Sequence, residues 1–282
     1  MTPEEIERIV RVTTQFGVTR VKLTGGEPML RDDIPEIVER IHTQGIKEIS
    51  MTTNGTRLAK LARTLKKRGL SRVNVSLHSL REDTFRLLTQ SCKLKETIQA
   101  IRVAVEVGLK PVKINMTLLK SINESEVEDM INFSKGLGGA RTNILQLIEF
   151  VSLDRASCTQ LHLKLDEIEE NIRRRAFAVR MRDLHRRPQY FLDNGVVVEI
   201  VRPVHNSSFC MGNNRLRITY DGKFKPCLLR DDNHVDFLSA MRSGASDADL
   251  VNIFKRAVSM REPFFKPQVE IPRNKILLTC AQ

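Results

Sequence analysis

The 282-residue chain contains no tryptophan, and aromatic residues make up only 5% of it. The chain is nevertheless basic, with 46 lysines and arginines against 34 acidic residues and a net charge of +12. This charge predicts attraction to polyanions or to a phosphorylated substrate. The arginine-rich residues 173–175 and 180–187 could form a nucleic-acid surface, but few aromatic rings are present on which bases could stack. We therefore favour a phosphorylated substrate over nucleic acid.

Long hydrophobic runs are also missing. Uninterrupted apolar stretches such as residues 196–198 are far shorter than the ~20 residues that cross a bilayer. Residues 1–5 have neither the basic segment nor the apolar core of a secretory signal. These two absences exclude a membrane-spanning protein and predict a cytoplasmic one.

Cysteines are few and scattered. The chain has five of them, at Cys92, Cys158, Cys210, Cys227 and Cys280. An odd number at wide spacing is not the framework of a disulfide-stapled secreted domain. Any functional cysteine in this chain is therefore expected to act in redox chemistry or in metal binding.

The first 150 residues alternate between helical and strand patterns, which is typical of βα units and a parallel sheet. Predicted helices cover residues 3–16, 33–44, 58–67, 82–89 and 93–107, and another capped helix begins at residue 123. Predicted strands cover residues 18–24, 48–52, 72–76, 112–118 and 143–150. Five such strands fit most of a barrel or an open doubly wound sheet.

The pattern changes after residue 154. A charged helix is predicted at 164–175 and a strand at 197–201, followed by a hairpin whose arms, 215–220 and 223–228, flank the turn at Asp221 and Gly222. Helices at 235–242 and 247–260 follow. The residues from Pro263 onward have no assigned structure.

Polar side chains recur near the carboxyl ends of three predicted strands. They are Lys22 and Thr24, Asn74 and Ser76, and Lys113 and Asn115. Each pair shares one face of its strand, because side chains alternate along a strand. Solvated residues at a barrel mouth would also be polar. Agreement among three strands favours a site there, where parallel barrels and sheets place their active sites.

Glycine-rich turns follow two of these strands. After Lys22 comes Thr24-Gly25-Gly26-Glu27, where the glycines let the backbone approach a ligand and Glu27 offers an acceptor for an ammonium or hydroxyl group. Residues 52–55, TTNG, end the next strand. A simple strand-to-helix turn explains this second motif equally well.

The order of these motifs resembles the radical S-adenosylmethionine superfamily. The motifs are KLTGGEP at 22–28, TTNG at 52–55, VNVSL at 73–77, VKIN at 112–115, FC at 209–210, NRLR at 214–217 and PC at 226–227. Within the superfamily the chain resembles the GTP 3',8-cyclase family of molybdenum cofactor biosynthesis, in particular its archaeal members, from residue 2 to about residue 260.

This resemblance implies a fold and its division. The implied fold is α/β: a partial TIM-type (β/α)6 barrel that lacks its first strand, with a C-terminal α+β extension. Residues 1–154 would form the partial barrel. Residues 155–262 would form the rest of the barrel and a C-terminal region for the auxiliary cluster and the substrate. Residues 263–282 would be a tail of unknown role.

The resemblance also implies ligands for particular residues, with S-adenosylmethionine and a [4Fe-4S] cluster as cofactors. For S-adenosylmethionine these are Gly25, Gly26, Glu27, Ser76, Asn115 and Val151. For GTP they are Lys22, Thr53, Lys113, Arg215, Leu216 and Arg217. For the metal they are Cys210, Cys227 and Asn213. Lysines and arginine forks are also what chemistry would place against a triphosphate.

The chain departs from the family pattern in its metal ligands. The superfamily holds its catalytic cluster with a C-x3-C-x2-C run, but no two cysteines of this chain lie within four positions of each other. We interpret this as a truncation, which would leave the chain inactive. Asn213 stands at a third family cysteine, so the auxiliary site has two thiolates. Gln146 replaces an arginine of bacterial members, a loss for which Arg20 or Arg217 could compensate.

The implied reaction converts GTP to (8S)-3',8-cyclo-7,8-dihydroguanosine 5'-triphosphate in molybdopterin synthesis. GTP and the next enzyme of that pathway are the implied partners, and a homodimer is compatible with the resemblance. Two alternatives stay open. One is another radical enzyme with an auxiliary cluster that modifies peptides, and the other is a cluster-free remnant that binds a nucleotide.

Overall fold

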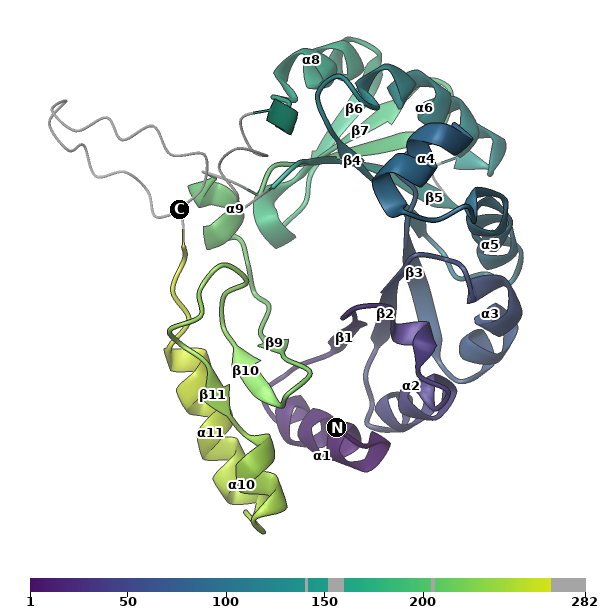
Figure 1. The fold of residues 1–282 in the computed structure, drawn as a ribbon. Helices are drawn as coiled ribbons and strands as arrows, with labels where there is room; N and C mark the ends of the chain where they lie inside the picture. The colour runs from purple at the N-terminus through teal and green to yellow at the C-terminus, as the bar shows by residue number, and fades with distance from the viewer. Residues whose placement is uncertain (140–141, 152–159, 204–205, 265–282) are drawn as a thin grey trace, which may run out of the picture.

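Eight strands form one sheet, which curves into an open arc in the computed structural model (Figure 1). The structure describes residues 1–139, 142–151, 160–203 and 206–264. Its strands are β1 (Arg20–Leu23), β2 (Glu48–Thr53), β3 (Leu70–Ser76), β4 (Val112–Leu118), β5 (Asn143–Glu149), β6 (Ala176–Met181), β7 (Pro188–Leu192) and β8 (Val197–Val201). Their order is β1-β2-β3-β4-β5-β8-β7-β6. Strands β1 to β5 and β8 run parallel, while the pairs β8–β7 and β7–β6 are antiparallel.

Helices cover the convex side of this sheet, as Figure 1 shows for α2, α3, α5 and α6. The helices of this part are α1 (Pro3–Thr14), α2 (Ile34–Thr43), α3 (Leu58–Lys67), α4 (Glu82–Thr89), α5 (Leu94–Glu106), α6 (Val127–Gly136) and α8 (Asp166–Arg174), with short 3-10 turns η1 (Pro28–Leu30), η2 (Glu124–Glu126) and η4 (Leu184–Arg186). Thr2 and Glu5 form a capping box at the start of α1. The buried faces of helices and strands form one continuous apolar core.

A smaller unit lies on the open side of the arc (Figure 1). It contains α9 (Ser207–Met211), the antiparallel strands β9 (Arg217–Ile218), β10 (Lys223–Lys225) and β11 (Val235–Asp236), and the helices α10 (Leu238–Arg242) and α11 (Asp247–Ser259). Its own core is joined by Ile9 and Val12 of α1. At the turn between β9 and β10, Gly222 has φ of +80°, and a Cβ there would lie 2.1 Å from the Cβ of Leu238. Glycine is therefore required at this turn.

The structure confirms the α/β class, the partial barrel type and all five strands predicted in the first 150 residues. It also adds the strand at 197–201 to the same sheet, next to β5. The helix predicted from residue 235 was wrong in its first residues, because Val235 and Asp236 pair with β10 as a strand and the helix begins at Leu238. Strands β6 and β7 were not predicted. The part of the tail beyond residue 264 lies outside the described residues.

None of the helices in the described ranges is both long enough and apolar enough to span a membrane.

Candidate functional site

The concave face of the sheet carries a layer of polar side chains in register. Asn115 of β4 lies beside Gln146 of β5, which lies beside Glu199 of β8, which in turn lies beside Gln189 of β7. Lys113 lies two positions before Asn115 and therefore on the same face. The alternation predicted from the sequence thus describes one continuous polar face.

Lys22 of β1 is half-buried and lies in register with Ser50 of β2 on this face. Burial, together with the charges of Arg215 and Arg72, lowers the pKa of Lys22 to about 7. Lys113 and Arg187 are close enough to contribute to the same effect. A lysine held among other cations is poised to gain its proton when an anion binds, because the anion offsets their repulsion.

Lys113 has a direct carboxylate partner. Its Nζ donates to Oε2 of Glu199 at 2.9 Å, and both side chains are buried. Burial lowers the pKa of Lys113, while the charge of Glu199 and its hydrogen bond oppose that shift. Burial would raise the pKa of Glu199, but the charges of Lys113, Arg187 and Arg182 outweigh it and bring the pKa to about 2. With three cations around one carboxylate, we regard this pair as charged at neutral pH.

Two arginines reach the same region from the smaller unit. Arg215 precedes β9 and Arg217 begins it. Burial, followed by the charges of Arg187 and Arg217, lowers the pKa of Arg215 to about 10. Burial also lowers the pKa of Arg217, and Cys227 opposes that shift, which places the Cys227 thiol near this guanidinium.

We call the following residues the inner basic cluster: Lys22, Arg72, Lys113, Arg182, Arg187, Arg215 and Arg217.

Amide side chains connect members of the cluster across the sheet. Arg72 donates to Oδ1 of Asn74 at 2.9 Å, and Asn74 donates to Oε1 of Gln146 at 3.1 Å. Gln146 then donates to Oε1 of Glu199 at 2.7 Å. Gln146 therefore supports the carboxylate that pairs with Lys113, which fixes the orientation of both side chains.

The glycine-rich loop after β1 is tied to the loop after β2 by one carboxylate. Glu27 accepts from the Thr53 hydroxyl at 2.7 Å, from the Asn54 backbone N–H at 2.6 Å and from the Met29 backbone N–H at 3.2 Å. Thr53 also accepts from the N–H of Gly55 at 2.9 Å. The structure thus brings two predicted site residues, Glu27 and Thr53, into direct contact. Both side chains already have protein partners.

The other residues predicted for S-adenosylmethionine lie at or beyond the carboxyl ends of the strands. Gly25 is exposed with φ of +130°, a conformation that favours glycine. Ser76 ends β3, half-buried and in register with Asn115 of β4. Val151 lies two residues after the end of β5. Ser76 and Asn115 are thus neighbours across two strands, and Glu27 is joined to the loop after β2 through Thr53.

The smaller unit contains two of the cysteines, Cys210 and Cys227. Cys210 is in α9 and Cys227 follows β10, and both are free and half-buried. The Asn213 side chain accepts from the backbone N–H of Arg215 at 3.0 Å and lies 3.1 Å from Nε2 of His185. The His185 ring stacks on Phe209 with centroids 4.0 Å apart. Asn213 thus connects the backbone at Arg215, just before β9, to the segment around His185.

These donors do not fit an iron-sulfur cluster by themselves. Such clusters are commonly held by four cysteine thiolates, and within the described ranges only Cys210 and Cys227 lie in this region. No group of three or more histidine, cysteine or acidic side chains in those ranges is arranged to hold a metal ion. The five cysteines of the sequence are also too widely spaced to form the C-x3-C-x2-C run of the superfamily's catalytic cluster. We therefore derive no chemical step through a cluster.

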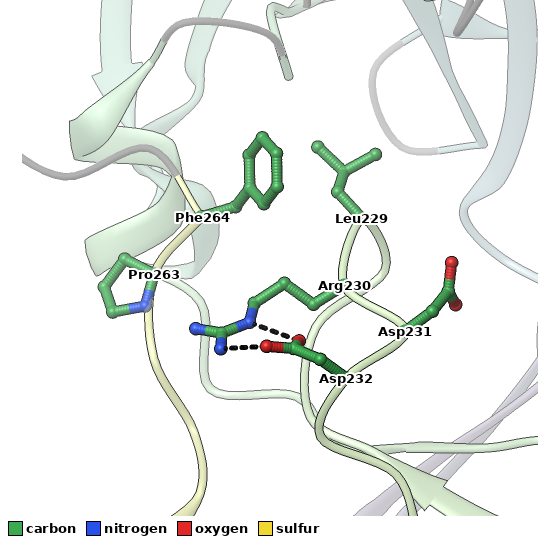
Figure 2. A pocket seen from close by; sticks show the side chains of 6 residues that line it. All are labelled: Leu229, Arg230, Asp231, Asp232, Pro263 and Phe264. Atoms are coloured by element: carbon green, nitrogen blue, oxygen red, sulfur yellow. Dashed lines mark hydrogen bonds and ion pairs between the residues drawn. The ribbon is translucent and has the colours of Figure 1, made fainter. Parts of the chain in front are cut away.

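A separate cleft lies beside the chain segment that leads to residue 264 (Figure 2). It is lined by Leu229, Arg230, Asp231, Asp232, Pro263 and Phe264. Its arginine is paired twice, with Asp232 at 2.7 Å and with Glu262 at 2.5 Å. Because carboxylates already neutralise this guanidinium, the cleft suits an anion less well than the inner basic cluster does.

Comparison with known proteins first defines the class. A family model described as the radical SAM superfamily matches residues 1–134, and one described as Molybdenum Cofactor Synthesis C matches residues 143–267. The crystal structure of Streptococcus suis SuiB bound to S-adenosylmethionine superposes with a TM-score of 0.62 at 18% identity, covering 84% of this chain and 56% of that one. The first of the two family models assigns residues 1–134 to the radical SAM superfamily, which implies S-adenosylmethionine and a [4Fe-4S] cluster as cofactors.

Curated relatives define the family. A protein of Thermococcus kodakarensis named "Probable GTP 3',8-cyclase" is 49% identical over 273 residues, which cover 94% of this chain and 87% of that protein. A protein of Pyrococcus horikoshii with the same name is 45% identical over 272 residues, covering 94% and 86%. This chain belongs to the GTP 3',8-cyclase family, as its motifs had predicted.

Three charged residues of the site were missed by the sequence analysis. Arg182 and Arg187 had been considered only as part of an arginine-rich stretch that could form a nucleic-acid surface, yet both pair with Glu199, at 3.0 Å and 2.8 Å. Glu199 itself stands alone among apolar residues in the strand 197–201. A single carboxylate in such a strand must find cations inside the protein, and this was the signal available in the sequence.

Proposed function

We propose that this chain binds GTP on the inner basic cluster and S-adenosylmethionine on the loops that follow β1 and β2, as a GTP 3',8-cyclase. The observation that carries the proposal is the cluster itself. Its members come from the strands of the sheet and from the smaller unit, and they surround few carboxylates. In a chain of this family, a concentrated internal positive charge suits a triphosphate.

Each part of the site has a role in this proposal. Lys22 and Lys113 supply ammonium groups to the phosphates, and Arg215 and Arg217 supply forked donors that fix a phosphate or a purine acceptor. Glu27 keeps the two loops together and receives the ammonium group of S-adenosylmethionine, with Gly25, Gly26, Ser76, Asn115 and Val151 around that ligand.

The reaction proposed is the conversion of GTP to (8S)-3',8-cyclo-7,8-dihydroguanosine 5'-triphosphate for molybdopterin synthesis, whose next enzyme would take up the product. That reaction would need S-adenosylmethionine together with a cluster. The described residues do not supply the ligands of a cluster, so the roles proposed for this chain are the binding of the nucleotide and of S-adenosylmethionine. The residues of this chain bind and orient the nucleotide and keep water from the reacting atoms.

Titration calorimetry with GTP tests this proposal. We expect GTP to bind at low ionic strength, with an affinity that falls as salt is raised, because part of the attraction is between charges that salt screens. Guanosine, which lacks phosphates, serves as the matched control and should bind much more weakly. Binding of peptides in the absence of any GTP binding would favour the peptide-modifying alternative instead.

A further inference from the structure

Glu199 is enclosed by five donors at the centre of the polar face. Its carboxylate is fully buried and pairs with Lys113 at 2.9 Å, Arg182 at 3.0 Å and Arg187 at 2.8 Å. Two amides complete the set, Gln146 at 2.7 Å and Gln189 at 2.8 Å. One negative charge thus faces three positive ones.

This imbalance is large for a buried site. Unpaired charge away from water is costly, and proteins normally compensate it with partners. Lys22 and Arg215 add further positive charge, since the pKa of each is lowered by the charge of Arg187 as well as by burial. An anionic ligand would supply the missing negative charge.

Arg187 is the member of the set with hydrogen-bonding capacity to spare. It is only 9% exposed, and its NH1 group contacts Glu199. Its Nε–H is buried and has no hydrogen-bond partner among the described residues. A buried donor without a partner has lost its hydrogen bonds to water and gains none in the protein, which costs free energy. Such donors are rare in native proteins and call for an explanation.

The chain segment before β7 sets the position of Arg187. His185 and Arg186 have φ of +64° and +47°, and the backbone N–H of His185 donates to the carbonyl of Gly212 at 2.8 Å. The backbone carbonyl of Arg187 accepts from the N–H of Arg182 at 2.9 Å. Arg187 is therefore held on the segment that also contacts the loop leading to Arg215.

We propose that Arg187 is a phosphate-binding residue of this site: Glu199 holds its NH1 group, and a small rotation of the side chain lets the unpartnered Nε–H donate to an oxygen of the triphosphate. This inference rests on the proposed GTP function for the identity of the ligand. It adds a residue from the β6–β7 hairpin to the lysines and arginines already assigned to GTP. A guanidinium that is fixed on one side and offers donors on another is suited to a phosphate oxygen.

Two variants of Arg187 separate binding from structure. Arg187→Lys keeps the positive charge for Glu199 but has no second donor group, whereas Arg187→Gln loses both. We expect Arg187→Lys to bind inorganic triphosphate and GTP about tenfold more weakly than the parent, and Arg187→Gln more weakly still, as for loss of a charge-assisted hydrogen bond. Arg180→Gln is the matched control, because it removes one arginine from the exposed strand β6 and should leave both affinities unchanged.

Calorimetry and thermal unfolding without ligand together distinguish a binding role of Arg187 from a purely structural one. A purely structural role would lower the Tm of the ligand-free variants and leave the affinity for inorganic triphosphate unchanged, and that result would overturn the inference. If one variant fails to fold, the other decides. If the parent binds inorganic triphosphate through Arg187 but does not bind GTP, the proposed function is wrong and the phosphate site stands. A parent that binds neither ligand overturns both.

Discussion

The low pKa of Lys22 predicts that nucleotide binding takes up a proton. In the free protein the pKa of Lys22 is lowered to about 7 by burial and by the charges of Arg215 and Arg72, so the side chain is mostly neutral at pH 8. A triphosphate favours the charged form and raises this pKa. Restoring the proton costs about 1.36 kcal/mol for each pH unit above 7, which is about tenfold in affinity per unit. Affinity should therefore fall as pH rises from 7 to 9.

Titration calorimetry at pH 7, 8 and 9, in two buffers with different ionisation enthalpies, measures both the affinity and the number of protons taken up. This range lies above the last phosphate pKa of about 6, so the ligand charge changes little. The parent should lose about tenfold in affinity per pH unit, whereas the affinity of Lys22→Met should change little with pH. Equal pH dependence in the parent and in Lys22→Met, or binding without proton uptake, would refute the assigned role of Lys22.

Three further predictions concern the loop carboxylate and the cysteine region. Glu27→Ala should abolish S-adenosylmethionine binding in calorimetry and cost roughly 1.5 to 3 kcal/mol of unfolding free energy, since it removes the acceptor shared by two loops; unchanged binding would count against this site. Arg217→Ala should weaken GTP binding more than Arg217→Lys, which keeps the charge; equal affinities would contradict a fork contact. Asn213→Cys should increase the iron and sulfide retained after anaerobic reconstitution, because it adds a thiolate; retention equal to that of the parent would argue against a cluster there.

The alternation of side chains made much of the site predictable. Lys22 and Lys113 stand at strand positions between apolar neighbours, so their inward direction followed from the period of two. The Asp221-Gly222 turn likewise predicted the hairpin that carries Arg217. These features are local in sequence, and local patterns are what a single sequence displays.

The β6–β7 hairpin could not be predicted in the same way. Residues 176–181 include three large exposed hydrophobic residues and an exposed arginine, and this edge strand shows no clear buried face. The burial of Arg182 and Arg187 depends on Glu199, which follows them in the chain by more than ten residues. Ion pairs of this kind are set by tertiary packing, so no local spacing indicates them.

The structure separates the two arginines considered as compensation for Gln146, because Arg217 lies in the inner basic cluster and Arg20 does not. We had considered Arg20 or Arg217 as substitutes for a missing arginine at this position. In the structure Arg20 is exposed at the start of β1, whereas Arg187 is buried beside the carboxylate that Gln146 contacts. Arg187 is therefore better placed than Arg20 to supply that charge.

A crystal structure of the protein with GTP tests the central claim most directly. The account predicts that the phosphates contact Lys22, Lys113 and the Arg215–Arg217 strand on the concave face of the sheet. Phosphates bound instead in the cleft between Leu229 and Phe264 (Figure 2), with no ligand at the inner basic cluster, would contradict it.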